Sequence, residues 1–385
     1  MAFKLTELKN CDVSDPFFDS LRADYRGFED WFGRKSTNGE SAYVGFGDDG
    51  RIHAFLMIKS TLEDTSDIGK EAPEGKYLKL STLKIDSELG GQRLGEGAIG
   101  IALWNWQHSE ARYIYLTVFP KHKDLIEQLV RYGFRIMGHN ENNERIYYRD
   151  KESLDFSDPR KCFPYFDPHI GKAKYLPIDD VFHDEMFQNS ELKGVEKGDF
   201  SLPVSNGITK VYIATPSDES SFRYEPGDLV FMYRRYTGEG PKRYKSAVTS
   251  YCTVTSCIHV KSNGVPLISY GDYKHAVGNK TIYSDEKVKS LFTEKKNVFV
   301  IEMVYNGSFE KGNNVNFNTL EENGLWGEGH PYTHTLSGDD ICKLLRLGKA
   351  NVRYPDIHQS RTRIQHPERE QEVRIPQDTM QEERG

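Results

Sequence analysis

Residues 76–86, KYLKLSTLKID, are followed at 90–100 by the glycine-rich stretch GGQRLGEGAIG. Apolar side chains alternate through the first stretch, which predicts a strand. The apolar residues after the glycines recur at the spacing of one helix face: Ile99, Ala102, Leu103 and Trp106. The sequence therefore predicts a strand that is joined to a helix by a glycine-rich turn, in which few residues have side chains. Backbone N–H groups in such a turn can approach a phosphate or diphosphate, and a turn that is merely flexible is the alternative.

Two common phosphate-binding motifs do not fit this turn. A Walker loop needs a Lys-Ser or Lys-Thr pair after the glycines, and none follows. A dinucleotide-binding fingerprint needs repeated strand–helix–strand units around it, and the flanking pattern lacks them. The turn therefore has to be interpreted from the order of the elements around it.

The elements around the glycine turn form a mixed α and β pattern over residues 1–150. Strands are predicted at 41–47 and 51–58, joined by the hairpin signal Asp-Asp-Gly. A further strand at 112–119 precedes a short amphipathic helix that Gly133 ends. A closing strand is predicted at 145–150.

This order resembles the GNAT acetyltransferase family over roughly residues 5–150. The acyl-CoA motif of that family is Q/R-x-x-G-x-G/A, which Gln92, Gly95 and Gly97 match. Seven positions separate Ile85 from Gln92, against about five in the family. Placing Gly90 at the Q/R position restores the spacing but loses the side chain. Both registers put Gly95 at the start of the helix.

The resemblance implies acetyl-CoA as the acyl donor. It places the diphosphate on the backbone of 91–97, with Arg93 as a phosphate partner, and the pantetheine arm along the strand at 83–85. The implied cofactor-binding residues are Leu83, Lys84, Ile85, Gly91, Gln92, Arg93, Leu94, Gly95, Glu96 and Gly97.

The residue that serves as the catalytic acid in the family is replaced in this chain. Family members often carry Asn eleven residues, and Tyr four residues, before the glycine of a terminal Gly-Phe pair. His122 and Leu129 occupy those positions in this chain. His122 and Tyr132 are the candidate catalytic residues, with an exposed helix-start histidine as the alternative for the first. The sequence does not choose a base among Ser81, Asp86 and Glu88.

The second part of the chain has a different texture. A proline-containing connecting segment is predicted at 151–204, and short β-rich segments with two helices follow at 205–348. A basic loop interleaves cations with tyrosines, the composition of a surface that binds RNA or another single strand. A solvated hairpin tip is the alternative. The predicted nucleic-acid-binding residues are Tyr233, Arg234, Arg235, Tyr236, Lys242, Arg243, Tyr244 and Lys245.

Residues 205–348 also resemble the PUA-like superfamily, in particular its ASCH and EVE branches. The stretches that carry this resemblance are PGDLVFMYR, GNKTIYSDEKVKSLF and NVFVIEMV. It implies a small β-barrel that reads RNA or modified bases. The predicted fold class is therefore α+β, with a GNAT-type mixed sheet covered on both faces by helices, then a PUA-like barrel. A charged, disordered tail is predicted at 349–385.

Composition limits the function classes. The formal net charge of −7 excludes a polycation, so nucleic-acid contact needs a local basic face. No signal peptide or apolar run of membrane-spanning length is present, which predicts a cytoplasmic protein without a membrane partner. The five cysteines are scattered, which predicts free thiols. His330 and His334 flank a proline, and no metal site is predicted.

The combined prediction is an acyl-CoA-dependent N-acetyltransferase whose second region presents RNA or a modified nucleic acid. The acceptor amine would lie on an aminoacyl-tRNA or a base. Transfer to an aminoacyl-tRNA would make the protein a translation-blocking toxin, for which an antitoxin is a candidate partner. One alternative is a protein acetyltransferase recruited to RNA or to a ribosomal partner. Another is an acyl-CoA sensor without activity, which Leu129 in the place of the acid would favour.

Overall fold

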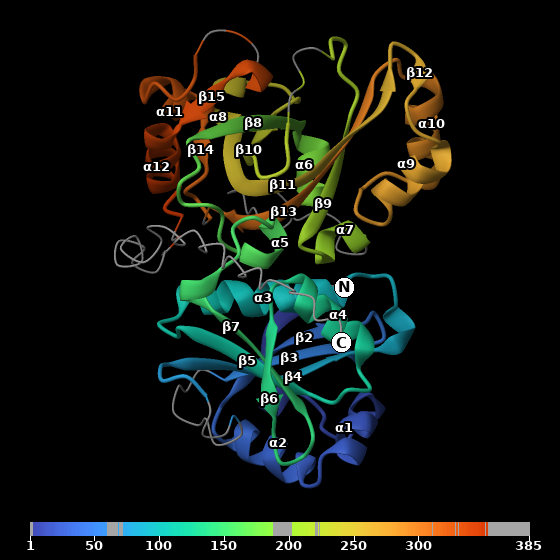
Figure 1. Ribbon diagram of the computed structural model, residues 1–385, viewed down its shortest axis with the longest axis vertical. Helices are drawn as coiled ribbons and strands as arrows, with labels where there is room; N and C mark the ends of the chain where they lie inside the picture. Colours follow the sequence, from blue (N-terminus) through green and yellow to red (C-terminus); the bar gives the residue numbers. More distant parts are fainter. Residues whose placement is uncertain are drawn as a thin grey trace, which may run out of the picture. The chain divides into compact units, whose positions relative to one another are not determined.

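The computed structural model describes residues 3–59, 72–187, 202–219, 224–309, 311–327 and 331–350, and the single positions 68, 222, 329 and 352. Its α+β architecture contains two mixed sheets with helices packed against them (Figure 1). In the described part of the chain, every helix is too short or too polar to cross a bilayer. The predicted tail at 349–385 lies almost wholly outside the described residues.

The first sheet has seven strands in the order β1-β2-β3-β4-β5-β7-β6, and all neighbours are antiparallel except β4 and β5. Its strands are β1 (Phe3–Glu7), β2 (Ser41–Phe46), β3 (Ile52–Lys59), β4 (Tyr77–Ile85), β5 (Tyr113–Val118), β6 (Arg135–His139) and β7 (Arg145–Asp150). The four strands predicted at 41–58, 77–85 and 112–119 and the closing strand at 145–150 are confirmed.

Helices lie on both faces of this sheet, as predicted (Figure 1). They are α1 (Asp19–Asp24), α2 (Phe28–Thr37), α3 (Leu94–His108) and α4 (Lys123–Arg131). On one face, Phe28 and Phe32 of α2 pack with Phe18 against Phe55 of β3. On the other face lies α3, which buries Ala98, Ala102 and Trp106, among others. Burial of this apolar area stabilises the sheet from both sides.

Strands β4 and β5 pair only at their beginnings. Their parallel register runs from Tyr77 to Lys79 on β4, although β4 continues to Ile85. Ser81 is an extra residue relative to β3, because Met57 pairs with Thr82 and Ile58 pairs with Leu80. Such a bulge bends its strand and commonly lies next to a functional site. The two strands therefore part where the chain leads into the glycine turn.

The second sheet has eight strands, with the main path β15-β8-β10-β11-β13-β9 and with β12 and β14 paired to β11. Its strands are β8 (Lys172–Asp179), β9 (Thr209–Ala214), β10 (Leu229–Arg235), β11 (Ala247–Ser262), β12 (Val265–Pro266), β13 (Val298–Ser308), β14 (Val315–Asn316) and β15 (Thr335–Ser337). The alternation along β13 sends Ile301 and Met303 to one core and Val298 and Val300 to another.

The helices of this region are short. They are α5 (Pro159–Cys162), α6 (Asp180–Met186), α7 (Pro203–Asn206), α8 (Lys242–Lys245), α9 (Tyr270–Val277), α10 (Asp285–Glu294), α11 (Phe317–Glu322) and α12 (Gly338–Leu347). The two helices predicted from SDEKVKSLF and SGDDICKLLRL correspond to α10 and α12. Closure into a barrel stays a prediction, because the pairings between described strands form an open path.

Part of the predicted connecting segment is folded into the second sheet. β8 pairs in parallel with β10 from Ala173 to Asp179, and Phe163 and Tyr165 are fully buried. Pro159 starts α5, where its missing N–H costs nothing. Of the prolines that suggested a linker, Pro159 therefore occupies a helix start and Pro177 a strand position, while Pro164 and Pro168 lie in turns. Residues 188–201 lie outside the described part of the chain.

Candidate functional site

A cavity of about 700 Å³ lies at the glycine turn, where β4 ends and α3 begins. We call it the α3 cavity. One wall is α4, and β9 and the segment before α10 contribute Thr209, Asn279 and Lys280 from the second region. The predicted cofactor-binding residues that line it are Leu83, Ile85, Gly91, Arg93, Leu94, Gly95 and Glu96. The structure thus brings seven of the ten together around one cavity.

The other three predicted cofactor residues have different surroundings. The Lys84 ammonium binds the carbonyl of Phe17 and, at 2.6 Å, the hydroxyl of Ser20. The Gln92 carbonyl accepts a hydrogen bond of 3.0 Å from the Asn206 side chain. A Cβ at Gly97 would lie 2.4 Å from the Asn206 carbonyl oxygen. Position 97 therefore requires a glycine because α7 packs directly against its backbone.

Gly95 has open space around it, unlike Gly97. A Cβ added at Gly95 would meet nothing within 4 Å, and the residue lines the α3 cavity in the first turn of the helix. The turn before it is held by left-handed backbone at Gly91 (φ 84°) and Arg93 (φ 58°). The helix therefore begins with unobstructed backbone at the cavity, where N–H groups favour an anion.

Glu96 is a buried carboxylate that joins the two regions of the chain. Its Oε1 accepts hydrogen bonds from the Thr209 backbone N–H (2.8 Å), the Thr209 hydroxyl (2.6 Å) and the Tyr132 hydroxyl (2.6 Å). Its Oε2 accepts from the Arg93 guanidinium (2.9 Å). Burial pushes the pKa of Glu96 up, but Arg93 and these donors outweigh it and lower the pKa to about 2. Glu96 is therefore ionised and structural.

Arg93 does not point freely into solvent, as a surface phosphate ligand would. Its side chain is 8% exposed and is paired with Glu96, and it packs against Gly207. One guanidinium nitrogen, Nη1, is nevertheless buried without a hydrogen-bond partner in the described part of the chain. A buried donor without a partner is costly, so its position in the wall of the α3 cavity favours an anionic ligand there.

The two candidate catalytic residues are not brought together. Tyr132 is fully buried, and its hydroxyl lies against Glu96 and Thr209. Burial and the Glu96 carboxylate raise the pKa of Tyr132, which opposes loss of its proton. His122 is exposed at the N-terminus of α4, and neither residue lines the α3 cavity. Leu129, at the position of the family's acid, is buried.

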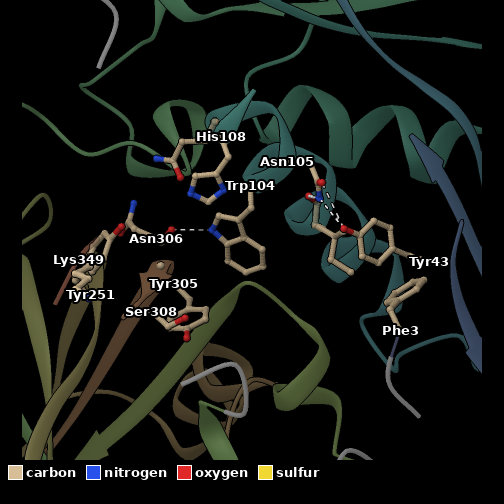
Figure 2. Close-up of a pocket in the computed structure, with 13 residues that line it drawn as sticks. Phe3, Tyr43, Trp104, Asn105, His108, Tyr251, Tyr305, Asn306, Ser308 and Lys349 are labelled. Atoms are coloured by element: carbon tan, nitrogen blue, oxygen red, sulfur yellow. Dashed lines mark hydrogen bonds between the residues drawn. The ribbon is translucent and has the colours of Figure 1, made fainter. Parts of the chain in front are cut away.

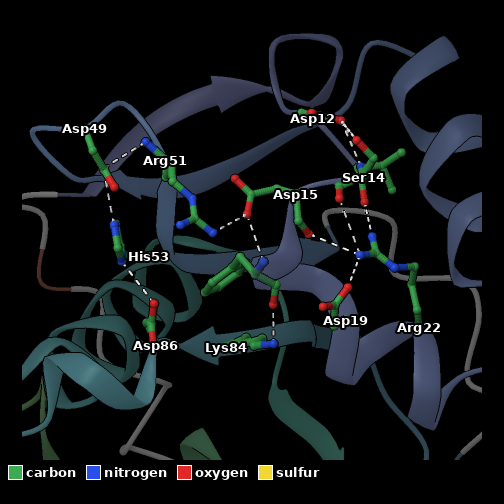
Figure 3. A network of polar contacts seen from close by, with 12 residues as sticks. Asp12, Ser14, Asp15, Asp19, Arg22, Asp49, Arg51, His53, Lys84 and Asp86 are labelled. Atoms are coloured by element: carbon green, nitrogen blue, oxygen red, sulfur yellow. Dashed lines mark hydrogen bonds and ion pairs between the residues drawn. The ribbon is translucent and has the colours of Figure 1, made fainter.

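A polar network fixes the end of β4 beside this cavity (Figure 3). His53 contacts Asp86 at 3.1 Å and Asp49 at 3.4 Å through its two ring nitrogens. Asp86 also accepts from the Glu88 N–H at 3.1 Å and so starts the turn that leads to the glycines. Asp86 lines the cavity and has a structural partner on each side.

A second cavity, of about 640 Å³, lies where β4 and β5 part and is lined by α2, β4, β5 and the β6–β7 hairpin. We call it the α2 cavity. Ser81, Thr82 and Thr117 line it at the strands. Its remaining lining is rich in cations and aromatic rings: Tyr25, Arg26, Phe28, Trp31, Arg34, Lys35, Lys59 and Lys79.

The charges of the α2 cavity are unequal. Glu144 is the carboxylate in its lining, and it accepts hydrogen bonds of 2.7 Å from both Tyr25 and Asn140. Lys35 pairs with Glu40 at 2.6 Å. Within the described part of the chain, Arg26 and Arg34 form no ion pair. The cavity therefore favours an anionic ligand.

The basic loop borders a third cavity, of about 490 Å³, which we call the Trp326 cavity. Trp326 and Phe317 line it together with Tyr233, and the Tyr233 and Trp326 ring centroids are 4.7 Å apart. The predicted nucleic-acid-binding residues that line it are Tyr233, Arg235, Tyr236, Lys242 and Arg243. Tyr244 is 60% exposed next to them.

Most cations of the basic loop have partners of their own. Arg234 is 5% exposed and forms two hydrogen bonds, of 2.8 and 2.7 Å, with Asp184, so it is not available at the surface. Arg235 pairs with Asp179, and Arg243 pairs with Glu321. Lys245 donates to Tyr236 and to the Glu239 carbonyl. Lys242 is exposed and forms no ion pair with any described residue.

The packing of α3 against the second sheet supports the α3 cavity. Figure 2 shows Trp104 of α3, whose indole N–H donates to the Asn306 carbonyl at 2.7 Å beside Tyr305. The Trp104 ring also packs edge-on against Phe163. A Cβ at Gly100 would lie 2.8 Å from Ile208. Gly97 and Gly100 of α3 thus make room for Asn206 and Ile208, a role that the sequence did not indicate.

Sequence reasoning missed the residues that complete the cavities from elsewhere in the chain. Asn279 donates a 2.6 Å hydrogen bond to the Gly91 carbonyl across 188 residues of sequence, and Lys280 lines the same cavity. Glu144 and Trp31 of the α2 cavity were also missed. The stretch GNKTIYSDEKVKSLF contained the first two, but its motif gave no signal for contact with the glycine turn.

No family model and no curated protein matches the chain. Among solved structures it is similar to nourseothricin acetyltransferase, with 19% identity and a TM-score of 0.22 over 28% of this chain and 62% of that one. It is also similar to Arabidopsis thaliana NAA60, solved with a bisubstrate analogue, with 14% identity and a TM-score of 0.29 over 38% of this chain and 97% of that one. A third similar structure is an ASCH protein from Zymomonas mobilis, with 10% identity and a TM-score of 0.30 over 46% of this chain and 99% of that one. At this level of identity, function has to be inferred from the cavities themselves.

Proposed function

We propose that this protein is an acyl-CoA-dependent N-acyltransferase that uses acetyl-CoA and holds its diphosphate in the α3 cavity. The observation that carries the proposal is the parting of β4 and β5 beyond Lys79, with the glycine turn and α3 at the opening. This leaves a strand edge beside a helix N-terminus, with one cavity on the α3 side and another on the α2 side.

The residues of the α3 cavity fit a diphosphate. The helix start at Gly95 is open to close approach, and the helix dipole adds partial positive charge. The buried Nη1 of Arg93 supplies a donor in need of an acceptor. Beyond Lys79, the backbone of β4 has no register partner on β5, so it can hold an extended amide-containing arm as an added strand would be held.

Acyl-CoA supplies an activated carbonyl: the acceptor amine forms a C–N bond as the C–S bond breaks, and the amine loses a proton while the thiolate gains one. Glu144 is the candidate to receive the proton on the acceptor side, because it is the carboxylate in the α2 cavity lining. Ser81 and Thr117 offer hydroxyls at the point where the strands part. With Leu129 at the usual position of the acid, orientation of the reactants is the main contribution.

The α2 cavity supports an anionic acceptor. Arg26 and Arg34 form no ion pair with described residues, and Trp31 adds an aromatic surface. Cations that meet phosphates and rings that stack on bases favour an amine carried by RNA, such as an aminoacyl-tRNA or a base, over a lysine-rich peptide. An antitoxin or ribosomal partner stays a further hypothesis.

The Trp326 cavity supports a second contact with RNA. Exposed cations surround an aromatic floor there: Arg235, Lys242 and Arg243 lie beside Tyr236, Phe317 and Trp326. Single-stranded or modified bases are commonly recognised by such stacking platforms. In this proposal the second region holds the RNA, while Arg234 stabilises β10 against α6 from the inside.

Two measurements test the proposal. Calorimetry of the full chain with coenzyme A should detect binding, and absence of heat would contradict the use of acyl-CoA. Radiolabelled acetyl-CoA is then incubated with separate cellular RNA, protein and DNA fractions. Label in RNA supports the proposed acceptor, and label in protein alone supports the protein acetyltransferase. Binding of coenzyme A with no label in any fraction supports a sensor.

A further inference from the structure

The α3 cavity is not built by the acyltransferase-like region alone. The Asn279 side chain, between α9 and α10, donates a 2.6 Å hydrogen bond to the carbonyl of Gly91 in the glycine turn. Its neighbour Lys280 lines the same cavity. Thr209 of β9 binds Glu96 in the first turn of the same helix. Three residues of the second region therefore belong to the wall of the cavity.

Cations gather at this end of the α3 cavity. Burial lowers the pKa of the Lys280 ammonium to about 8, and the positive charges of Arg93, Arg131 and Arg160 add to the effect. The positive charge of Arg131 also contributes, after burial, to the lowered pKa of Arg160. An anion bound beside Lys280 would offset the repulsion that its ammonium meets from these cations.

The nearby carboxylates compensate only part of this charge. Glu302 binds both Lys280 and Arg160, and Glu96 binds Arg93. Two carboxylates therefore face four cations. Asp86 and Asp124 also line the cavity, but Asp86 contacts His53, and Asp124 lies in the first turn of α4.

An independent observation also points to an anion. The Arg93 side chain is 8% exposed, yet its Nη1 has no hydrogen-bond partner among the described residues. An ammonium has three donors, so Lys280 retains donors beyond its contact with Glu302. Arg93 and Lys280 come from the two regions of the chain and line one cavity.

We infer that Lys280 and Asn279 of the second region form part of the diphosphate-binding wall for coenzyme A. The inference rests on the proposed function and deepens it. Lys280 donates to the diphosphate within the α3 cavity, and Asn279 positions the glycine turn by holding the Gly91 carbonyl. The second region is then required for binding of the acyl donor, beyond any role in binding the acceptor.

Titration calorimetry on the full chain tests this inference with coenzyme A and dephospho-coenzyme A as probes. Lys280→Gln should weaken the binding of both about tenfold and reduce the salt dependence of binding. Lys280→Arg should retain most of the affinity, and Asn279→Ala should weaken it less than Lys280→Gln does. Lys289→Gln, on the exposed face of α10, is the matched control and should bind like the natural chain.

The outcomes separate the inference from the proposed function. If the natural chain binds no coenzyme A, both the inference and the proposed function are overturned. Binding by the natural chain with unchanged affinity in Lys280→Gln would overturn the inference alone. A loss confined to coenzyme A, with dephospho-coenzyme A unaffected, would overturn the assignment to the diphosphate. Because Lys280→Gln also removes a partner of Glu302, its thermal unfolding is measured, and rescue by Lys280→Arg shows that charge at this position governs binding.

Discussion

The glycine turn before α3 and the end of β10 each contain a buried arginine that is paired with a carboxylate, but the two arginines differ in the donors that are left over. Arg93 in the first is buried against Glu96 and keeps one donor at a cavity. Arg234 in the second is buried against Asp184, with Lys242 left exposed further along the loop. The comparison teaches that composition alone does not identify a ligand-binding cation. What matters is whether the fold leaves one of the donors of that cation without a partner.

Removal of Glu96 should have the largest effect, because it links Arg93, Tyr132 and Thr209 at once. Glu96→Ala leaves a buried guanidinium without its counter-ion and should lower the free energy of unfolding by roughly 3–5 kcal/mol. Urea denaturation at pH 7 measures this. Glu127→Ala, on the exposed face of α4, is the control and should stay within about 0.5 kcal/mol of the natural chain. An equal loss of stability in Glu96→Ala and Glu127→Ala would show that the contacts of Glu96 with Arg93, Tyr132 and Thr209 do not stabilise the fold.

The same contact gives an expected pH dependence. The pKa of Glu96 is lowered to about 2 from a usual 4.5, so its stabilisation is fully present above pH 4.5 and is lost as the pH falls through 2. The difference in stability between the natural chain and Glu96→Ala should therefore shrink between pH 5 and pH 2.5. Denaturation curves at these two pH values check the sign. A difference that grows in acid would contradict an ionised Glu96.

Arg234 and Lys242 provide the next test of the comparison. Arg234→Ala removes two hydrogen bonds to Asp184 and should lower the free energy of unfolding by about 2–3 kcal/mol. Lys242→Ala removes an exposed cation and should change it by less than about 0.5 kcal/mol. Binding of a single-stranded RNA probe should weaken in Lys242→Ala and lose part of its salt dependence. Unchanged RNA binding in a folded Lys242→Ala would remove the basic loop from the proposed function.

The local elements could be predicted from the sequence, whereas the contacts between distant elements could not. The strand, turn and helix at 76–108 have clear periodicity and were confirmed with boundaries close to those predicted. β8 was missed because Pro177 suggested a linker, although its partner Tyr233 lies in a parallel strand. The bond between Glu96 and Thr209 spans 113 residues of sequence, so neither residue signals the other.

The candidate site divides in the same way. Gly95 was predicted from a local motif and Leu83 from the family resemblance, and both line the α3 cavity. Gly97 matched the same motif, but its immediate neighbour is the Asn206 backbone, which no sequence pattern announces. Arg234 and Arg235 are adjacent in β10, but Arg234 is buried like the five strand residues before it and Arg235, the last residue of the strand, is exposed, a boundary that the sequence does not mark.

Gly95 and Gly97 sharpen the comparison at a smaller scale. Gly97→Ala places a Cβ 2.4 Å from the Asn206 carbonyl oxygen and should cost about 1–3 kcal/mol of stability. Gly95→Ala meets nothing within 4 Å and should leave stability unchanged or raise it by up to about 1 kcal/mol. Its methyl group would nevertheless occupy the helix start, so affinity for coenzyme A should fall. Thermal unfolding of both variants measures the effect on packing, and calorimetry with coenzyme A measures the effect on binding. A loss of stability in Gly95→Ala together with a loss of affinity alone in Gly97→Ala would contradict the roles given to the two glycines.

The smallest expected effect concerns Lys210, a buried cation whose ammonium donates to the Val204 carbonyl and lies over the Tyr305 ring. Burial lowers its pKa to about 7 from 10.5, so the amine must lose a proton when the chain folds between these pH values. The resulting penalty is full below pH 7 and disappears as the pH approaches 10.5. Lys210→Met should therefore stabilise the protein at pH 7 by about 1 kcal/mol, since an apolar side chain of similar length replaces a cation without its own carboxylate. Urea denaturation at pH 7 and pH 9.5 should show the advantage of the variant shrinking with rising pH. An advantage that is equal at both pH values would mean that the Lys210 ammonium stays charged in the folded chain, as the paired Arg93 and Arg234 do.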